Sequence, residues 1–485
     1  MKRFVWIGLV ITSLAVVAAQ CGASQAATSV TTNVANTQST PTAIEEKVVS
    51  KKEDAAGAVA EATVENTETV EESAEESATE ESKEETTASE AVAEEANNTT
   101  EQETPTEAGG HPEDCGDPFA GISIRFRPQV WTTDGIGRFV GSHIVDPDSD
   151  LATNFCLHSV DYAEILSGGP PPDGIPPIDN PEFDSIAVGD EWLADVQPVI
   201  ALAAGDEAKA YPLAILTRHE IANDEIAGIP VAVTFCPLCN AGIVFNREVD
   251  GEVLRFGVSG NLRNSDLVMW DNKTLSWWQQ FTGQAIVGDM TGTQLEMIPT
   301  QMVSWKDFKE AYPDGTVLST RGGSYGRNPY AGYDSSTQPF LLLGTPDSRL
   351  TAMERVLGYF SGDTAVAYPL PLIADEGVIE DSLDGQNVVI FYEPGQVSAL
   401  DQGVIELSKE VGSAGMFIPE ADGQPLTFSY NKGVITDNET GSEWDVFGRA
   451  IGGELAGSQL EPILSHTHFW FAWAAFRPDT TVYGQ

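Results

Sequence analysis

The chain repeats a long part of its own sequence, and this repeat limits the folds open to it. GDEAKAYPLAIL from Gly205 matches GDTAVAYPLPLI from Gly362. The block 271–319 then matches the block 437–484, in the same order along the chain. Matching blocks in one order predict two tandem modules built on one plan.

The first module is expected over 190–349, and a second, degenerate module over 350–485. Short apolar runs alternate with turn residues: PVIALAAGDEAKAYPL is typical of two strands around a Gly-Asp turn, and IVFNREVDGEVLRFGV of a hairpin with an Asp-Gly turn. Helix-compatible spacing occurs in MVSWKDFKEAYPD and HFWFAWAAFRPD, which occupy corresponding places. The sequence therefore predicts a β-rich α+β fold of two related modules, each with short antiparallel strands and one or two helices.

The pattern of residues 1–21 predicts that the chain is exported and lipidated. A short basic start precedes an apolar stretch that is shorter than a membrane span, and AAQC ends at Cys21, as in a bacterial lipoprotein signal. An ordinary secretory signal with an incidental Cys21 is the alternative. Residues 22–110 are rich in Glu, Thr, Ser and Ala, so they predict a disordered acidic stalk. We expect an extracytoplasmic protein attached to the cell membrane through a lipid on Cys21.

Residues 111–189 form a leading segment that contains a Pro-rich linker. Cys115 and Cys156 lie in this segment. In the oxidising compartment that an export signal implies, the two could form a disulfide, although sequence does not fix the pairing.

Acidic residues outnumber basic ones by 74 to 25, which gives a formal net charge of −49. A charge of this sign argues against nucleic acid as a partner. The sequence has no Gly-rich phosphate loop, no Gly-x-Ser-x-Gly elbow and no His-Glu-x-x-His signature, so nucleotide, serine-hydrolase and metalloprotease chemistry lack support. Whether the chain is an enzyme stays open here, and so does the identity of a small-molecule or envelope-protein partner.

The Cys-Pro-Leu-Cys segment of the first module has no counterpart in the second. Cys236, Cys239 and His219 form a donor set of two sulfurs and one nitrogen, which suits copper or zinc. Further ligands could come from Glu220, Met269, His466 or His468. Thiol–disulfide chemistry is a second interpretation, although a strand rather than a helix is expected to follow the pair. A structural disulfide, or two buried thiols that tighten a turn, is the third.

His219 and Glu220 also occur in the first module only. On a strand their side chains would point to opposite faces, whereas on a helix or turn both could enter one pocket. His466 and His468 of the second module have the spacing that places both rings on one face of a strand. Metal ligation and a plain cap or turn position are both open for this pair.

Polar residues crowd the segment SGNLRNSDLVMWDNKTLSWW of the first module. Arg263, Asn264, Asp266 and Trp278 are predicted to bind a sugar or carboxylate ligand, with Arg263 as the anion partner. A buried Arg263–Asp266 pair that satisfies a loop is the alternative. Trp278 has a counterpart in Trp444, which favours a role in packing for both.

The first module resembles the bacterial and archaeal family known as domain of unknown function 3179. The resemblance depends on His-Glu, Cys-Pro-Leu-Cys, SGNLRNSDLVMW and the Trp-Gln-Phe-Thr-Gly run appearing in this order. It implies family membership without an assigned activity. The residues themselves favour a lipid-anchored protein with a soft-metal or thiol site in the first module. The alternative is a non-enzymatic ligand-binding or scaffold module of the cell envelope whose cysteines are structural.

Overall fold

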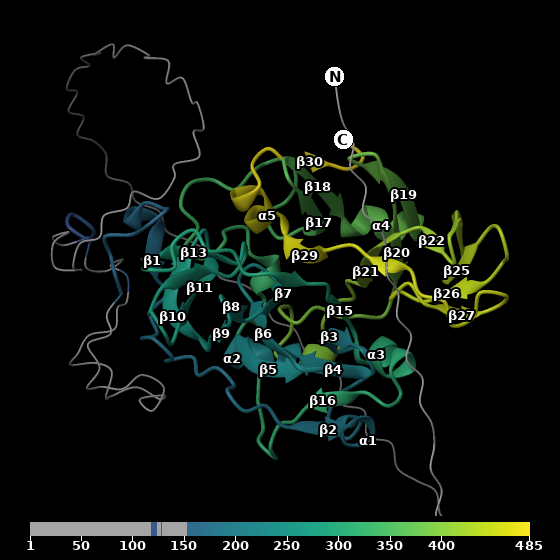
Figure 1. Ribbon diagram of the computed structural model, residues 1–485, viewed down its shortest axis with the longest axis horizontal. Coiled ribbons are helices and arrows are strands. Elements are labelled where there is room, and N and C mark those ends of the chain that lie inside the picture. The colour runs from purple at the N-terminus through teal and green to yellow at the C-terminus, as the bar shows by residue number, and fades with distance from the viewer. Residues whose placement is uncertain (1–117, 124–127, 129–152) are drawn as a thin grey trace, which may run out of the picture. The chain divides into compact units, whose positions relative to one another are not determined.

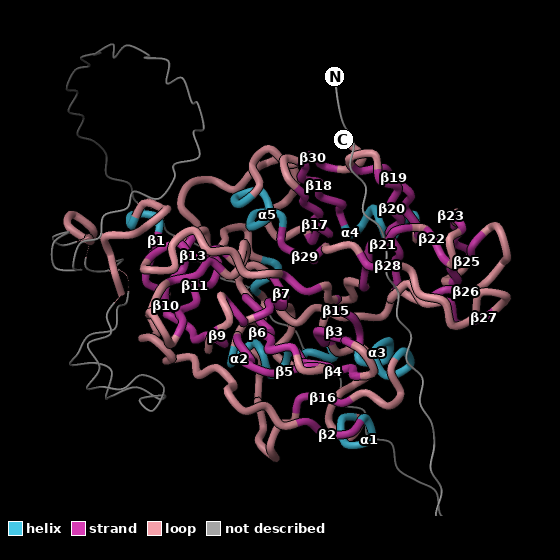
Figure 2. The backbone as a smooth tube through the Cα atoms, in the orientation of Figure 1, coloured by secondary structure: helices cyan, strands magenta, loops and turns pink. Residues whose placement is uncertain are grey.

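Short strands make up most of the folded chain, and the few helices are one or two turns long (Figures 1 and 2). The computed structural model describes residues 118–123, 128 and 153–485. The predicted signal, Cys21, the predicted stalk and Cys115 lie outside the described residues. The prediction of a β-rich fold with few helices and many short antiparallel sheets is confirmed.

Three sheets and a small hairpin build the part of the chain before residue 350. The first sheet has the order β1 (Ile165–Ser167), β10 (Phe256–Arg263), β11 (Asp266–Asp271), β12 (Trp277–Gln279), β13 (Gln284–Val287). The second has the order β14 (Met297–Ile298), β7 (Ala241–Asn246), β6 (Ile229–Cys236), β5 (Ile221–Ile226). The third has the order β15 (Gln301–Ser304), β3 (Pro198–Ala204), β4 (Glu207–Pro212), β16 (Thr316–Leu318), β2 (Phe183–Ser185). The small hairpin is β8 (Glu248–Val249) with β9 (Glu252–Val253).

The part after residue 350 has its own three sheets and small hairpin. The first sheet has the order β24 (Phe428–Asn431), β25 (Val434–Asp437), β26 (Glu443–Trp444), β27 (Ala450–Gly452). The second has the order β28 (Glu461–Pro462), β21 (Ser413–Ile418), β20 (Gln386–Glu393), β19 (Val378–Leu383). The third has the order β29 (Ser465–Phe469), β17 (Arg355–Ser361), β18 (Thr364–Pro369), β30 (Thr481–Val482). The small hairpin is β22 (Glu420–Ala421) with β23 (Gln424–Pro425).

Helices connect or cover these sheets. The α-helices are α1 (Ile186–Gly189), α2 (Leu213–His219), α3 (Trp305–Ala311), α4 (Leu370–Glu376) and α5 (Trp470–Phe476). Short 3-10 turns are η3 (Tyr162–Glu164), η4 (Tyr333–Ser335) and η5 (Ile405–Leu407). The two predicted helices are confirmed as α3 and α5, and the two predicted strand pairs as β3–β4 and β8–β9. Local turn chemistry therefore identified these elements.

Two strand pairs depart from the antiparallel expectation. β16 runs parallel to β4, and β30 runs parallel to β18. Each of these short strands follows a helix, α3 or α5, that carries the chain back across the sheet. A helical crossover is the ordinary way for a chain to place a parallel strand. The two parallel strands therefore follow from the two predicted helices.

One apolar core extends through both parts of the chain. Phe235 and Trp278 come from the first part, Phe469 and Trp473 from the second, and all four are buried in the same cluster. In Figure 1 the teal and yellow segments meet where β7 lies beside β29. Because this core is shared, the two parts are expected to depend on each other for stability.

Each part also contains the same polar network around a buried aspartate. The indole N–H of Trp278 donates to Asp271 Oδ2 at 2.9 Å, and that of Trp444 donates to Asp437 Oδ2 at 3.0 Å. In both networks, a threonine hydroxyl and a serine backbone N–H donate to the same aspartate. Trp278 is therefore held in the scaffold of the β11–β12 turn.

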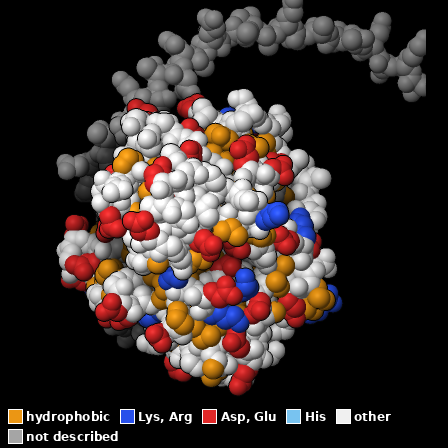
Figure 3. All heavy atoms as spheres, turned by 90° about the vertical axis from the view of Figure 1, so that its right-hand side faces the viewer, with side chains coloured by type: hydrophobic (Ala, Val, Ile, Leu, Met, Phe, Trp, Pro, Cys, Tyr) orange, Lys and Arg blue, Asp and Glu red, His pale blue; other side chains and the backbone are white. Residues whose placement is uncertain are grey.

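Acidic side chains are spread over the face of the molecule in Figure 3, with fewer Lys and Arg among them. Cys156 is disulfide-bonded, and its partner lies outside the described residues. Among residues 118–123, 128 and 153–485, no helix is long and apolar enough to cross a membrane.

Candidate functional site

Cys236 and Cys239 lie in the tight turn between β6 and β7. Cys236 is the last residue of β6, and its carbonyl accepts the N–H of Cys239 at 3.2 Å. Asn240 closes the turn with φ +50°, a left-handed conformation that Asn tolerates better than most side chains. Both cysteines are free and buried. A strand follows the pair, as expected, so no helix N-terminus is available to activate a thiol.

Asp266 reaches the two thiols from the neighbouring β10–β11 hairpin. Its two-residue turn, Asn264 and Ser265, has positive φ at both positions, as tight hairpins require. The turn places Asp266 at the start of β11, with a carboxylate oxygen and the two Sγ atoms all within 4.8 Å of one another. Three buried donor atoms from two different sheets therefore converge on one point.

The two oxygens of Asp266 have different surroundings. Oδ2 accepts the side-chain N–H of Gln279 at 2.7 Å and the backbone N–H of Phe281 at 2.9 Å. Oδ1 is buried and accepts no N–H or O–H group among the described residues, while the thiols of Cys236 and Cys239 hydrogen-bond to the carboxyl group. Gln280 ties the same segment to β6 and β7, because its Nε2 donates to Thr234 Oγ1 at 2.8 Å. The Trp-Gln-Phe-Thr-Gly run therefore fixes Asp266 in place while leaving one of its oxygens without an N–H or O–H donor.

Burial dominates the electrostatics of this cluster. It raises the pKa of Asp266 to about 7, although the hydrogen bonds from Gln279 and Phe281 act in the opposite direction. Burial also raises the pKa of Cys236 and of Cys239. Within residues 153–485, Asp266 makes no ion pair with Lys, Arg or His. The cluster is therefore acidic, dehydrated and without a positive partner of its own.

His219 lies elsewhere. It is the last residue of α2, and its Nδ1 is 2.7 Å from the carbonyl of Pro176, so that nitrogen carries the proton and donates. The Nε2 atom is 3.3 Å from the hydroxyl of Tyr325. Burial lowers the pKa of His219 and keeps the ring neutral. The structure brings Asp266, and not His219, to the two cysteines.

Glu220 follows His219 but turns away from it. It is the C-cap of α2, with φ +58°, and its N–H donates to the carbonyl of Leu216. Its buried carboxylate accepts the hydroxyl of Tyr330 at 3.4 Å. Burial raises the pKa of Glu220 to about 8. The open question from the sequence is thus answered: a helix end separates the two side chains.

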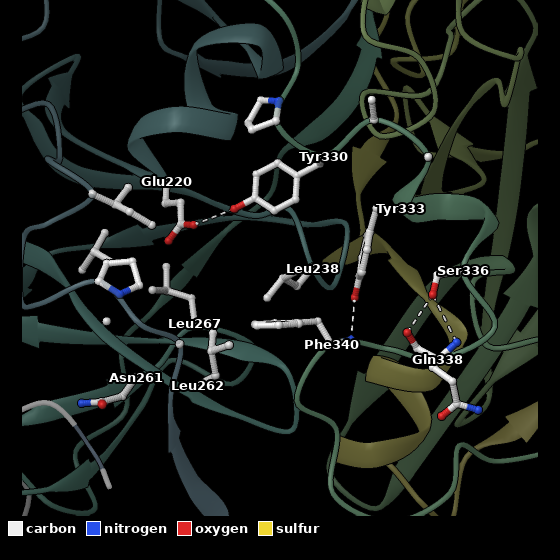
Figure 4. Close-up of a pocket in the computed structure, with 18 residues that line it drawn as sticks. Glu220, Leu238, Asn261, Leu262, Leu267, Tyr330, Tyr333, Ser336, Gln338 and Phe340 are labelled. Carbon is white, nitrogen blue, oxygen red and sulfur yellow. Dashed lines mark hydrogen bonds between the residues drawn. The ribbon is translucent and has the colours of Figure 1, made fainter. Parts of the chain in front are cut away.

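Glu220 lines a cavity of about 560 Å³ beside the cysteine cluster (Figure 4). Leu238, which lies between the two cysteines in sequence, and Leu267, which follows Asp266, form part of the wall. Tyr330 and Tyr333 come from the long connection between the two parts of the chain. The cavity and the cluster therefore share a wall of two leucines.

The other predicted ligand-binding residues do not gather at this cavity. Arg263 pairs with Glu164, with 2.7 Å between Nη2 and Oε2, so the alternative Arg263–Asp266 pair is not the one that forms. Asn264 occupies the hairpin turn. Asn261 and Leu262 of the same hairpin line the cavity instead. The polar residues of this segment therefore contact different neighbours: Arg263 pairs with Glu164, and Asp266 lies beside the two cysteines.

His466 and His468 are buried in the interior of β29, not at a cap or turn. The rings of His468 and Phe281 have centroids 4.4 Å apart. The backbone N–H of the adjacent Phe469 donates to the carbonyl of Cys239 at 2.9 Å. β29 therefore supports the cysteine turn, but neither histidine belongs to the group of converging donors.

The sequence predicted Asp266 as a ligand-binding residue and did not group it with the two cysteines, and it gave no sign of the residues that hold it. Gln279 and Phe281 were visible as part of a run in the first module; in the repeat, Asp445 replaces Gln279, whereas Phe447 keeps the phenylalanine. Tyr330 and Tyr333 belong to a connection that has no counterpart in the repeat. No pattern in the sequence indicated that this connection reaches the site.

Comparison with known proteins finds one family. A family model described as "Protein of unknown function (DUF3179)" matches residues 172–480. No curated protein and no solved structure matches the chain. The matched range contains both cysteines, Asp266, Glu220 and the connection that covers the cavity.

Proposed function

This chain belongs to the DUF3179 family, whose description names no activity, and from the site itself we propose that it is a metal-binding protein with a zinc centre at Cys236, Cys239 and Asp266. One observation carries the proposal: Asp266 Oδ1 is buried, accepts no N–H or O–H group of the described residues, and lies in a group with two free thiols. A buried carboxylate that has no positive partner is costly even when one of its oxygens is hydrogen-bonded, because burial removes the charge from water. A cation at this point removes that cost.

The donor set favours zinc over copper(I). Zinc accepts thiolate and carboxylate ligands together, at about 2.3 Å for sulfur and about 2.0–2.2 Å for oxygen. Copper(I) prefers sets that are entirely soft. Three protein donors leave one position of a tetrahedral ion for an exogenous ligand. Metal binding also requires both thiols and the carboxyl to lose their protons, so affinity is expected to rise with pH.

The two other interpretations of the cysteines have weaker support. A redox thiol needs a lowered pKa, whereas burial raises the pKa of both thiols. A purely structural cysteine pair does not need a buried carboxyl beside it, because apolar neighbours would be less costly. The metal proposal therefore explains the presence of Asp266, whereas the redox and structural interpretations do not.

We also propose that the protein is extracytoplasmic, anchored by a lipid on Cys21 and raised on the acidic stalk 22–110. The disulfide of Cys156 supports an oxidising compartment. The two-module plan is proposed as an internal duplication, supported by the corresponding strand order of the sheets, apart from the added strands β1 and β2, and by the matching Asp271 and Asp437 networks. In this proposal the second module, 350–485, keeps the scaffold and lacks the metal ligands.

Metal analysis of the full chain tests the zinc centre. The purified protein should contain one zinc per chain, and Cys236→Ser and Asp266→Asn should each lose it. Losing a residue that only supports a ligand already weakens metal affinity by about 10- to 100-fold, so losing a ligand should exceed roughly 100-fold. Asp307→Asn is the matched control, because Asp307 is also buried with a raised pKa, but its carboxylate accepts the hydroxyl of Ser304, the N-cap of α3.

The control should keep its zinc at the wild-type level. The proposal fails if the wild-type protein binds neither zinc nor copper, or if Asp266→Asn binds zinc as tightly as the wild type. Selective copper(I) binding that is unchanged in Asp266→Asn would instead indicate a copper site formed by the two sulfurs.

A further inference from the structure

The cavity beside the cluster has a deep end and an open end. Glu220 and Leu267 are buried at the deep end. Gln338 and Phe340 are exposed at the open end, and Phe340 is 47% exposed. Figure 4 shows Leu238 between Glu220 and the Ser336–Gln338 segment, with Leu267 and Leu262 below Glu220. The volume of about 560 Å³ falls in the usual range for small-molecule sites.

The backbone at Glu220 is strained in a way that a scaffold role does not require. Its φ of +58° costs a residue with a side chain about 1 kcal/mol. Helix α4, at the equivalent place of the second part, ends instead on Gly377 with φ +73°. Glycine adopts this conformation without strain. The first part therefore keeps a carboxylate where glycine would close the helix more easily.

The residues that line the cavity include an acidic side chain but no basic one. None of the 18 residues that line it is Lys, Arg or His, and Glu220 is its single ionisable carboxyl. Glu220 makes no ion pair with any described residue, and one hydroxyl, from Tyr330, is its side-chain hydrogen-bond partner. Tyr330, Tyr333 and Phe340 add aromatic faces, which attract cations. The walls therefore disfavour carboxylate and phosphate ligands.

We propose that this cavity binds a small amphiphilic amine. The Glu220 carboxyl releases its proton to solvent on binding, and the resulting carboxylate pairs with the ammonium group at the deep end, where the ammonium also contacts the ring of Tyr330. The apolar body lies over Leu238, Leu262 and Leu267. The excess of acidic residues in the chain favours the approach of a cation. The site uses a different carboxyl from the zinc centre, because Glu220 is not one of the three converging donors.

Three matched probes test the proposal on the full chain by isothermal titration at about 0.15 M salt, which screens binding to surface charges. The probes are 4-phenylbutylamine, 4-phenylbutan-1-ol and 4-phenylbutanoate. A charged hydrogen bond in a buried site predicts that the amine binds at least roughly tenfold more tightly than the alcohol. The carboxylate should bind most weakly of the three.

Variants assign the preference to Glu220. Glu220→Gln should remove the preference for the amine while keeping zinc, and Tyr330→Phe should keep it, because the ring remains. Glu393→Gln is the matched control: Glu393 also has a pKa that burial raises, but it lies on β20, away from the cavity. Phe340→Ala, at an exposed position, should weaken amine binding several-fold without a folding defect.

Equal binding of the amine and the alcohol by the wild type would overturn the proposal. So would an amine preference that survives in Glu220→Gln, tighter binding of the carboxylate, or no binding of any probe. Asp266→Asn separates the two sites, because it should lose zinc and still bind the amine.

Discussion

Asp266 accepts two N–H donors on Oδ2 and none on Oδ1, and the position of this carboxyl beside two buried thiols is the basis of the proposed zinc centre. The cysteine pair was recognisable from its spacing, because both ligands lie in one turn. The third donor comes from another hairpin, and spacing along the chain does not report which residue of that hairpin faces the turn. His219 was the expected third donor, and the end of helix α2 directs its ring to Pro176 instead.

Substitutions of Glu220 can separate the cost of its backbone strain from its role in amine binding. Glu220→Gly replaces a side chain at φ +58° by the residue that tolerates this conformation. We expect the free energy of unfolding in urea to rise by about 1 kcal/mol, while amine binding is lost. Glu220→Ala, which keeps the strain and removes the carboxylate, should show no such gain. A lower stability for the glycine variant would show that the Glu220 side chain has a structural role.

At the level of elements, hairpins and helices were predictable because their signals are local. The Asp-Gly turn of β8–β9 and the helix of Trp305–Ala311 are examples. The pairing of β16 with β4 was not, since it joins residues about a hundred positions apart in the chain through a crossover that no local pattern encodes. The contact of Tyr330 with Glu220 was not predictable either, because it also joins residues far apart in the chain.

The Asp271 and Asp437 networks give a prediction about these elements. Asp271→Ala and Asp437→Ala each leave a buried indole N–H and several turn groups without an acceptor. Each should lower the free energy of unfolding in urea by roughly 3 kcal/mol. Asp314→Ala, at an exposed position, should change it by less than about 0.5 kcal/mol. A large loss in one variant and none in the other would contradict equal scaffold roles in the two parts.

At the scale of the whole molecule, β29 joins the second part to the cysteine turn of the first. Its histidines make this junction sensitive to acid. Burial lowers the pKa of His466 to about 4, and lowers that of His468 well below its usual value. Below pH 6.5 the unfolded chain therefore takes up protons that the folded chain does not, so these rings reduce stability as pH falls from about 6.5 toward 4.

His466→Gln measures this contribution. The steepest dependence that one such group adds is about 1.4 kcal/mol per pH unit. Unfolding in urea at pH 7, 6 and 5 should show that the variant loses less stability than the wild type on acidification. Glu393, whose pKa burial raises to about 7, changes stability with pH in the opposite direction. This contribution is the same in the wild type and in His466→Gln, so the difference between the two slopes isolates His466. Equal slopes would contradict a neutral, buried His466.

X-ray absorption at the zinc edge of the purified full chain tests the central claim most directly. The account predicts a shell of two sulfurs at about 2.3 Å and a shell of oxygen at about 2.0–2.2 Å. In Asp266→Asn this oxygen shell should shrink or the metal be absent. A zinc spectrum without sulfur, or with four sulfurs, would contradict a centre made by Cys236, Cys239 and Asp266.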